Sequence, residues 1–149
     1  MIPSTAERVE RSTGQQINRQ IQAEIRESIR WHAAHPDRIG FRLRELDEEW
    51  DIERTLEANA STLAFTGVAL AAAVDRRFLV VPAIVTAFLF QHAVQGWCPP
   101  LPILRRLGFR TAREIDTERT ALKAIRGDFA CVHEADDRAA AAINAVSRP

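Results

Sequence analysis

The amino-acid sequence predicts an all-α protein in which a transmembrane helical hairpin is flanked by amphipathic helical arms. Two long stretches in the middle of the chain carry no charge, although 20 Lys and Arg balance 20 Asp and Glu over the whole sequence. The regions before and after these stretches carry apolar residues at helical spacing among charged ones. A cluster of prolines near the end of the second stretch would stop a helix there, at Pro99, Pro100 and Pro102.

The charge-free stretches are long enough to cross a membrane. The first comprises the 17 residues Ala58–Val74, and the second comprises the 27 residues Phe78–Leu104. A helix needs about 20 mostly apolar residues to cross the ~30 Å hydrocarbon core, with a lower limit near 17. We therefore expect a hairpin over residues 58–98, with spans at 58–74 and 78–97 and a short polar turn between them.

A soluble helical bundle is the alternative reading of the same stretches. Helices that are surrounded on all sides are also free of charge, and the first stretch is diluted by Ala, Ser, Thr and Asn. The flanking arms of a 149-residue chain would then have to cover every face of two consecutive helices. This requirement favours the membrane.

The N-terminal arm, residues 1–36, has the pattern of one amphipathic helix. Ser4 and Glu7 form a capping box, which is typical of a helix start. An apolar stripe then recurs every four residues up to the region of Pro36, at Ile17, Ile21, Ile25 and Ile29. Such a stripe needs a partner, which could be a second copy of the chain, a later arm or the membrane surface.

The remaining arms continue this pattern. Residues 37–57 are expected to form an amphipathic helix that leads into the membrane, and residues 99–149 an interfacial segment followed by a helical arm. In the latter, Thr111 and Glu114 form a second capping box, and Gly127 would end the helix that begins there.

The distribution of basic residues predicts the orientation in the membrane. A hairpin places both termini on one side, and eighteen Lys and Arg lie in the arms against two in the turn. The positive-inside rule then places both termini in the cytoplasm. The residues expected to anchor the hairpin at the interface are two tryptophans and two arginines, namely Trp50, Trp97, Arg105 and Arg106.

Within the spans, small and polar residues indicate where helices meet. Small residues follow one face of the first span, at Ala60, Ala64, Gly67 and Ala71. They predict a close contact between the two spans or between two protomers. Three polar residues stand late in the second span, Gln91, His92 and Gln95, where we expect interhelical hydrogen bonds or a water-facing surface.

The region Ile52–Thr111 resembles the YgaP-like family of inner-membrane proteins. The likeness is carried by a Gly-x-Cys-Pro motif and a Leu-Gly turn, at Gly96, Cys98, Pro99, Leu107 and Gly108. It implies a self-associating hairpin of the bacterial cytoplasmic membrane, found alone or fused to a rhodanese-type domain. This chain has no α/β pattern, so sulfurtransferase activity is not carried over.

Cys98 is the residue with the most chemical potential. The positive charge of Arg105 and Arg106 would favour its thiolate, and hence thiol or persulfide transfer. The alternative is a small buried residue that helps to end the helix. A nucleophile needs a positioned base, and the sequence identifies none for Cys98.

We therefore expect a non-enzymatic integral membrane protein that anchors or scaffolds a complex, or associates with itself. The alternatives are a membrane-linked thiol or persulfide carrier that uses Cys98, and a soluble helical interaction protein. Neither a cofactor site nor a metal-ligand set stands out. The expected partners are membrane lipid and a second copy or another protein, and a net charge of zero argues against nucleic acid.

Overall fold

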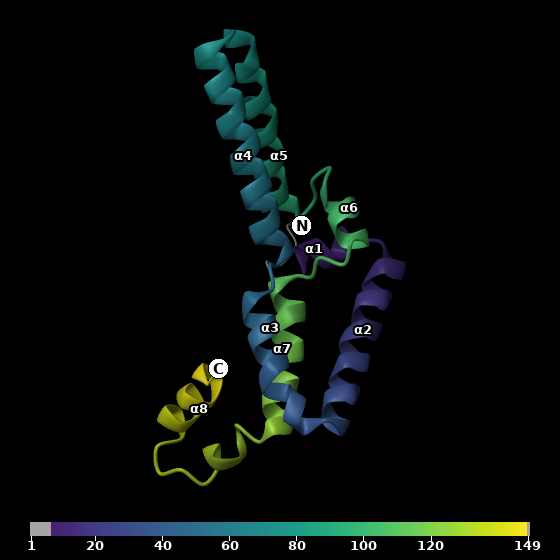
Figure 1. Ribbon diagram of the computed structural model, residues 1–149, viewed down its shortest axis with the longest axis vertical. Coiled ribbons are helices and arrows are strands. Elements are labelled where there is room, and N and C mark those ends of the chain that lie inside the picture. Colours follow the sequence, from purple (N-terminus) through teal and green to yellow (C-terminus); the bar gives the residue numbers. More distant parts are fainter. Residues whose placement is uncertain (1–6, 149) are drawn as a thin grey trace. The chain divides into compact units, whose positions relative to one another are not determined.

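The computed structural model describes residues 7–148, and every regular element in this range is helical (Figure 1). The fold class is therefore all-α, as the sequence predicts. The α-helices are α1 (Arg8–Arg11), α2 (Gln15–Ala34), α3 (Ile39–Glu48), α4 (Ile52–Ala73), α5 (Val80–Gln95), α6 (Leu101–Arg106), α7 (Ala112–Arg126) and α8 (Arg138–Ser147). Short 3₁₀ turns connect some of them, at Pro36–Arg38, Arg76–Leu79 and Ala130–Val132.

The described chain divides into two compact units. The helix-pair unit comprises residues 7–20 and 50–112, and the arm unit comprises residues 21–49 and 113–148. Each unit has its own buried apolar cluster.

In the helix-pair unit, α4 and α5 lie side by side and run in opposite directions (Figure 1). Their connection is a tight turn in which the Asp75 carboxylate accepts a hydrogen bond of 2.8 Å from the Arg77 amide. The helices approach each other most closely at Gly67, where a Cβ atom would lie 2.6 Å from Pro82 Cδ. A glycine at this position therefore lets the two backbones come together.

The small-residue stripe lies on the packed face of α4. Between residues 59 and 73, the residues that are not exposed are Ala60, Ala64, Gly67 and Ala71. The stripe thus coincides with the covered side of α4.

The outward faces of the pair are apolar. Phe65 of α4 is 77% exposed and Phe90 of α5 is 72% exposed. By length and composition, one helical stretch in the described residues can cross a membrane, Arg76–Gln95, and 6% of its apolar window is buried. α4 does not reach the same apolar content because it begins with charged residues and contains Ser, Thr and Asn. Composition thus supports one span where the sequence pattern predicts two.

Several polar side chains of the pair donate hydrogen bonds inside their own helix. The hydroxyls of Thr62, Thr66 and Thr86 each donate to the carbonyl four residues earlier, at 2.8, 2.8 and 2.7 Å. The Asn59 amide donates to the Thr55 carbonyl in the same way, at 2.8 Å. The three hydroxyl hydrogens therefore need no acceptor outside their helix.

Gly96 ends α5 with a positive φ of 75°. Its amide donates to the His92 carbonyl at 2.7 Å, and a Cβ atom here would lie 2.5 Å from the Arg8 carbonyl oxygen. Only glycine meets both the left-handed backbone and this close approach by α1. The chain then reverses and enters α6, and the unit's buried cluster forms around the reversal, from Val9, Ile52, Leu56, Cys98 and Leu101.

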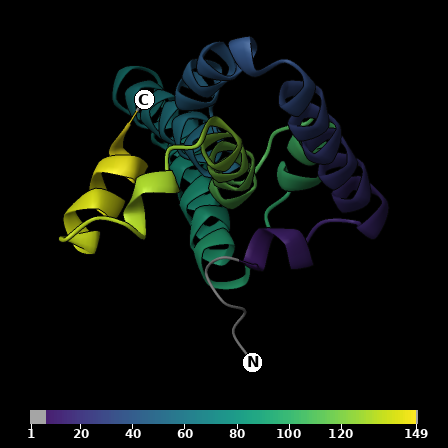
Figure 2. The same ribbon diagram turned by 90° about the horizontal axis from the view of Figure 1, so that it is seen from below.

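The arm unit is built from α2 beyond residue 20, α3, α7 and α8. In both views α7 lies between α2 and α8 (Figures 1 and 2). Its buried cluster joins α3 and α7, from Ile39, Leu43, Leu46, Ile115 and Leu122. The end of α8 is tied to α7 because Lys123 Nζ donates to the Val146 carbonyl at 2.7 Å.

A fully buried carboxylate, Glu118, links three helices of this unit. It accepts a 2.6 Å hydrogen bond from the Ser28 hydroxyl of α2. The Arg42 guanidinium of α3 donates to its two oxygens at 2.9 and 3.2 Å. A bidentate pair of this kind fixes orientation as well as distance.

The structure corrects the predicted arms in two places. The N-terminal arm is not one helix, because the chain turns between α1 and α2, where Thr13 Oγ1 donates to the Val9 carbonyl at 2.7 Å. Residues 37–57 are also interrupted, because Asp51 caps a new helix by accepting a bond from the Arg54 amide. Of the predicted first capping box, Ser4 lies outside the described residues.

Candidate functional site

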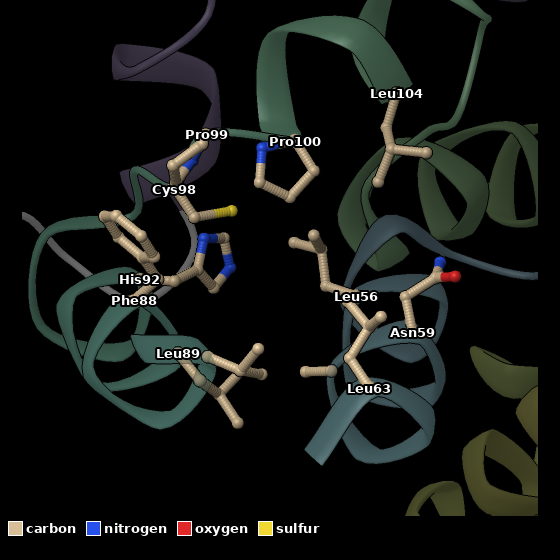
Figure 3. Close-up of a pocket in the computed structure, with 12 residues that line it drawn as sticks. Leu56, Asn59, Leu63, Phe88, Leu89, His92, Cys98, Pro99, Pro100 and Leu104 are labelled. Atoms are coloured by element: carbon tan, nitrogen blue, oxygen red, sulfur yellow. The ribbon is translucent and has the colours of Figure 1, made fainter. Parts of the chain in front are cut away.

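Cys98 is buried at the base of the helix pair. Its side chain belongs to the apolar cluster of the unit and is 4% exposed. Figure 3 shows its sulfur pointing towards the imidazole of His92, which is itself 3% exposed. The structure therefore supplies a basic side chain beside the thiol, which the sequence does not identify.

The imidazole is held from its other side by a carboxylate. His92 Nε2 lies 2.8 Å from Glu53 Oε2, and the second oxygen of Glu53 accepts a 3.0 Å bond from Arg8. Arg8 also donates to the Ala93 carbonyl at 3.3 Å. Arg8 thus contacts Glu53, Glu53 contacts His92, and His92 lies beside Cys98.

The Glu53 carboxylate determines which nitrogen of His92 carries the hydrogen. The hydrogen bond with His92 lowers the pKa of the Glu53 carboxyl below its ordinary value of 4.5, partial burial opposes this, and Arg8 adds to the lowering. An ionised carboxylate only accepts hydrogen bonds, so Nε2 of His92 carries the hydrogen of their contact. In the neutral ring the lone pair is then on Nδ1.

Nδ1 of His92 is buried and makes no hydrogen bond with another group of the described chain. A buried polar atom without a partner is costly, and it marks a place where a proton or a ligand can be received. Cys98 is the adjacent group that carries a proton. The arrangement has the logic of a nucleophile, a base and a residue that orients the base.

The local fold explains why these residues meet. His92 stands on the last turn of α5, and Gly96 reverses the chain so that Cys98 folds back against that turn. Glu53 stands on the first turn of α4, which runs antiparallel to α5, so its carboxylate reaches the end of α5. The Gly-x-Cys-Pro motif therefore has a geometric role, because its glycine brings the cysteine to the histidine.

A cavity of about 420 Å³ opens beside the thiol (Figure 3). Asn59 and His92 supply an amide and an imidazole among lining side chains that are otherwise mostly aliphatic or aromatic. The cavity is lined by Leu56, Asn59, Ala60, Leu63, Val85, Phe88, Leu89, His92, Cys98, Pro99, Pro100 and Leu104. Its size is within the range of small-molecule sites.

The predicted polar residues of the second span do not act as a group. His92 is the member that faces the cavity, while Gln91 is half-buried and Gln95 is exposed. The interhelical hydrogen bond expected in this region is made by His92 with Glu53.

The predicted interface anchors lie in different environments. Trp50 is 46% exposed and Trp97 is 39% exposed, and the Arg54 guanidinium lies 4.2 Å above the Trp50 ring. Arg106 is exposed. Arg105, however, is buried and donates to the Phe109 carbonyl and to Asn18 Oδ1, both at 3.0 Å. Its guanidinium therefore binds protein groups rather than facing outward to lipid phosphates.

A second cysteine and two histidines belong to the arm unit. Cys131 is exposed and belongs to the arm unit. His32 and His35 contact the carbonyls of Ser28 and Trp31, four residues earlier. In residues 7–148 no group of three or more His, Cys, Asp and Glu side chains is placed to hold a metal ion.

Comparison with known proteins adds no relative to this description. Searches of family models, of curated proteins and of solved structures each give no match. The resemblance to the YgaP-like family accordingly rests on the motif residues themselves.

Proposed function

We propose that the chain is a small integral membrane protein of the bacterial cytoplasmic membrane, anchored by α4 and α5 with both termini in the cytoplasm. The observation that carries this proposal is the exposure of α5, whose stretch Arg76–Gln95 is apolar yet 6% buried. A core helix of a soluble bundle would be covered by its neighbours. Apolar helix faces of this extent need lipid or another protein to cover them.

Two further features support the membrane. The threonine hydroxyls of α4 and α5 are satisfied within their helices, which removes the penalty of placing them in hydrocarbon. The contact at Gly67 is of the close, small-residue kind that holds helices together in lipid. In this proposal the arms bind a partner or a second copy, and the protein acts as an anchor or scaffold.

The test is fractionation of the expressed chain, followed by a carbonate wash of the membranes. We expect retention in the washed membrane, and cross-linking in mild detergent should then yield a dimer or a complex. Release into the soluble fraction would contradict the anchor. A chain that is retained but stays monomeric, with no partner cross-linked, would contradict the scaffold and leave the anchor in place.

A thiol function at Cys98 is the second candidate, namely a membrane-linked carrier that accepts a group on its sulfur. It is favoured by the imidazole beside the thiol and by the 2.8 Å contact that orients this imidazole on Glu53. A buried cysteine that only fills space would need neither.

This second candidate is tested by alkylation with iodoacetamide in mild detergent, followed by intact mass measurement. In the Cys131→Ser chain, Cys98 should react, and His92→Gln should slow the reaction about tenfold or more. Equal rates with and without the imidazole would contradict a thiol function. The Cys98→Ser chain serves as the control, since it retains only the exposed Cys131.

A further inference from the structure

We propose that Cys98 accepts the acyl group of a medium-chain acyl thioester, whose hydrocarbon chain occupies the cavity between α4 and α5. This inference rests on the thiol function proposed above and names its substrate class. It is carried by the juxtaposition of a buried thiol, an imidazole nitrogen without a partner, and an apolar cavity that begins at the thiol.

The lining of the cavity selects an apolar ligand. Most of its twelve lining residues are aliphatic, aromatic or proline. The polar side chains of Asn59 and His92 also line it, and the Asn59 amide already donates to the Thr55 carbonyl. No lysine or arginine lines it, so it offers no counter-charge for a phosphate or a carboxylate. A small polar sulfur donor would leave most of the 420 Å³ unfilled, whereas a hydrocarbon chain occupies more of it and contacts its apolar lining.

The extent of the cavity indicates the length of that chain. Leu56 and Leu63 both line it and stand seven residues apart on α4, which corresponds to about 10 Å along the helix. Val85 and His92 have the same separation on α5. With C–C bonds of about 1.5 Å and tetrahedral angles, an extended chain advances about 1.3 Å per bond, so about eight bonds cover this distance. Cys98, Pro99 and Pro100 lie at one end of it, so the reacting carbonyl would sit at that end (Figure 3).

The reaction is a thioester exchange without net oxidation or reduction. The Cys98 thiol gives its proton to Nδ1 of His92, and the sulfur attacks the thioester carbonyl carbon. The tetrahedral intermediate then breaks its bond to the leaving sulfur. His92 returns the proton to that leaving thiolate, so the products are S-acylated Cys98 and a free thiol.

Glu53 acts as a positioning residue in this scheme. It holds the hydrogen on Nε2, so that the lone pair of Nδ1 faces the thiol. It does not touch the acyl group, because it is not among the residues that line the cavity.

The experiment uses the full chain in mild detergent with octanoyl-coenzyme A as the probe. Intact mass should show the gain of one octanoyl group in the Cys131→Ser chain, and neutral hydroxylamine should remove it. Cys98→Ser should abolish the gain, and His92→Gln should slow it about a hundredfold. Octanoyl transfer should exceed acetyl transfer from acetyl-coenzyme A by at least about tenfold, because each buried methylene adds to binding.

A second pair of variants tests the cavity without touching the reacting groups. Leu63→Trp fills its far end and should lower the ratio of octanoyl to acetyl transfer about tenfold. Val68→Trp is the matched control, because Val68 lies on the same helix, is 50% exposed and does not line the cavity. It should keep the ratio of the parent chain.

Three results would overturn the proposal, and they separate it from the thiol function. If iodoacetamide alkylates Cys98 with His92 dependence but octanoyl transfer fails, the thiol function stands and the acyl substrate is wrong. If neither reagent modifies Cys98, both are wrong. If octanoyl and acetyl groups transfer equally, or Leu63→Trp leaves the ratio unchanged, the cavity does not select the chain.

Discussion

The helix-pair unit and the arm unit both pack helices against one another, but they differ in which side chains lie in the contact and which lie outside it. In the arm unit the apolar side chains of α3 and α7 meet in a buried cluster, and most of the exposed residues of these two helices are polar or charged. In the helix-pair unit the contact between α4 and α5 uses small residues, and the large apolar side chains point outward, Phe65 and Phe90 among them. Helical periodicity alone therefore does not show which side of a helix is covered by its neighbours.

The carboxylates that bridge helices also differ between the units. Glu118 of the arm unit is closed in by Ser28 and Arg42, so its oxygens have donors from two other helices. Glu53 of the helix-pair unit has Arg8 on one oxygen and His92 on the other, and beyond His92 lies a cavity. Glu118 therefore links helices in a fully buried position, whereas Glu53 orients a histidine that lines a cavity.

Removal of the buried Glu118 carboxylate should destabilise the protein more than any other change considered. Glu118→Ala leaves the Arg42 guanidinium and the Ser28 hydroxyl without their shared acceptor, and should destabilise the arm unit by about 3 kcal/mol. Hydrogen exchange of the full chain in mild detergent, read peptide by peptide, should show faster exchange in α3 and α7. Glu45→Ala is the control, because Glu45 also pairs with Arg42 but its side chain is 46% exposed, and the expected loss is about 0.5 kcal/mol. Equal losses would show that burial of Glu118 is not what matters.

The next effect tests the close contact in the helix pair. Gly67→Ala places a Cβ atom 2.6 Å from Pro82 Cδ and 3.0 Å from Val81 Cβ, so the helices must separate. We expect a loss of about 2 kcal/mol in the stability of the α4 and α5 contact, measured by thermal melting in detergent. Gly40→Ala is the opposite case, since nothing lies within 4 Å of a Cβ there, and it should stabilise α3 by up to about 1 kcal/mol. Stabilisation by both variants would mean that α4 and α5 are not tightly packed.

The ion pair between Arg126 and Asp128 in the arm unit should make a smaller, pH-dependent contribution to stability. Arg126 donates to both oxygens of Asp128 at 2.9 and 2.6 Å, and this lowers the pKa of the Asp128 carboxyl below its ordinary value of 3.8. A lowered carboxyl pKa stabilises the fold above pH 3.8, and the contribution is lost as the pH falls through the pKa of the folded state. Asp128→Asn should therefore lower the free energy of unfolding by about 1 kcal/mol at pH 7. It should have no effect at a pH where Asp128 is protonated in both the folded and the unfolded state. Denaturant unfolding at pH 7 and at a pH below the folded-state pKa of Asp128 tests this, with the exposed Asp136→Asn as a control.

Much of the fold could be predicted because its signals are local. Charge-free runs, small-residue spacing and proline clusters each act within a few residues, and they place α4, the stripe through Gly67 and the end of α5. The breaks before Gln15 and Ile52 were missed because they depend on side-chain hydrogen bonds, from Thr13 and to Asp51, that compete with the continued helix.

The site could not be predicted in full because its contacts are distant in the sequence. Glu53 and His92 are 39 residues apart, and Glu53 and Arg8 are 45 apart, so no spacing rule joins them. One local signal was available. Gly96 favours a left-handed end to α5, and such an end returns the following residues to the last helical turn, where His92 stands.

The hydroxyl hydrogens of Thr62, Thr66 and Thr86 are donated to carbonyls of their own helices. None of these three donors has to exchange a water molecule for a new partner when water is replaced by detergent or by lipid. The choice of medium therefore acts mainly on the exposed apolar side chains of the pair, Phe65 and Phe90 among them. A surfactant for this chain can be selected first by how well its tails cover these side chains.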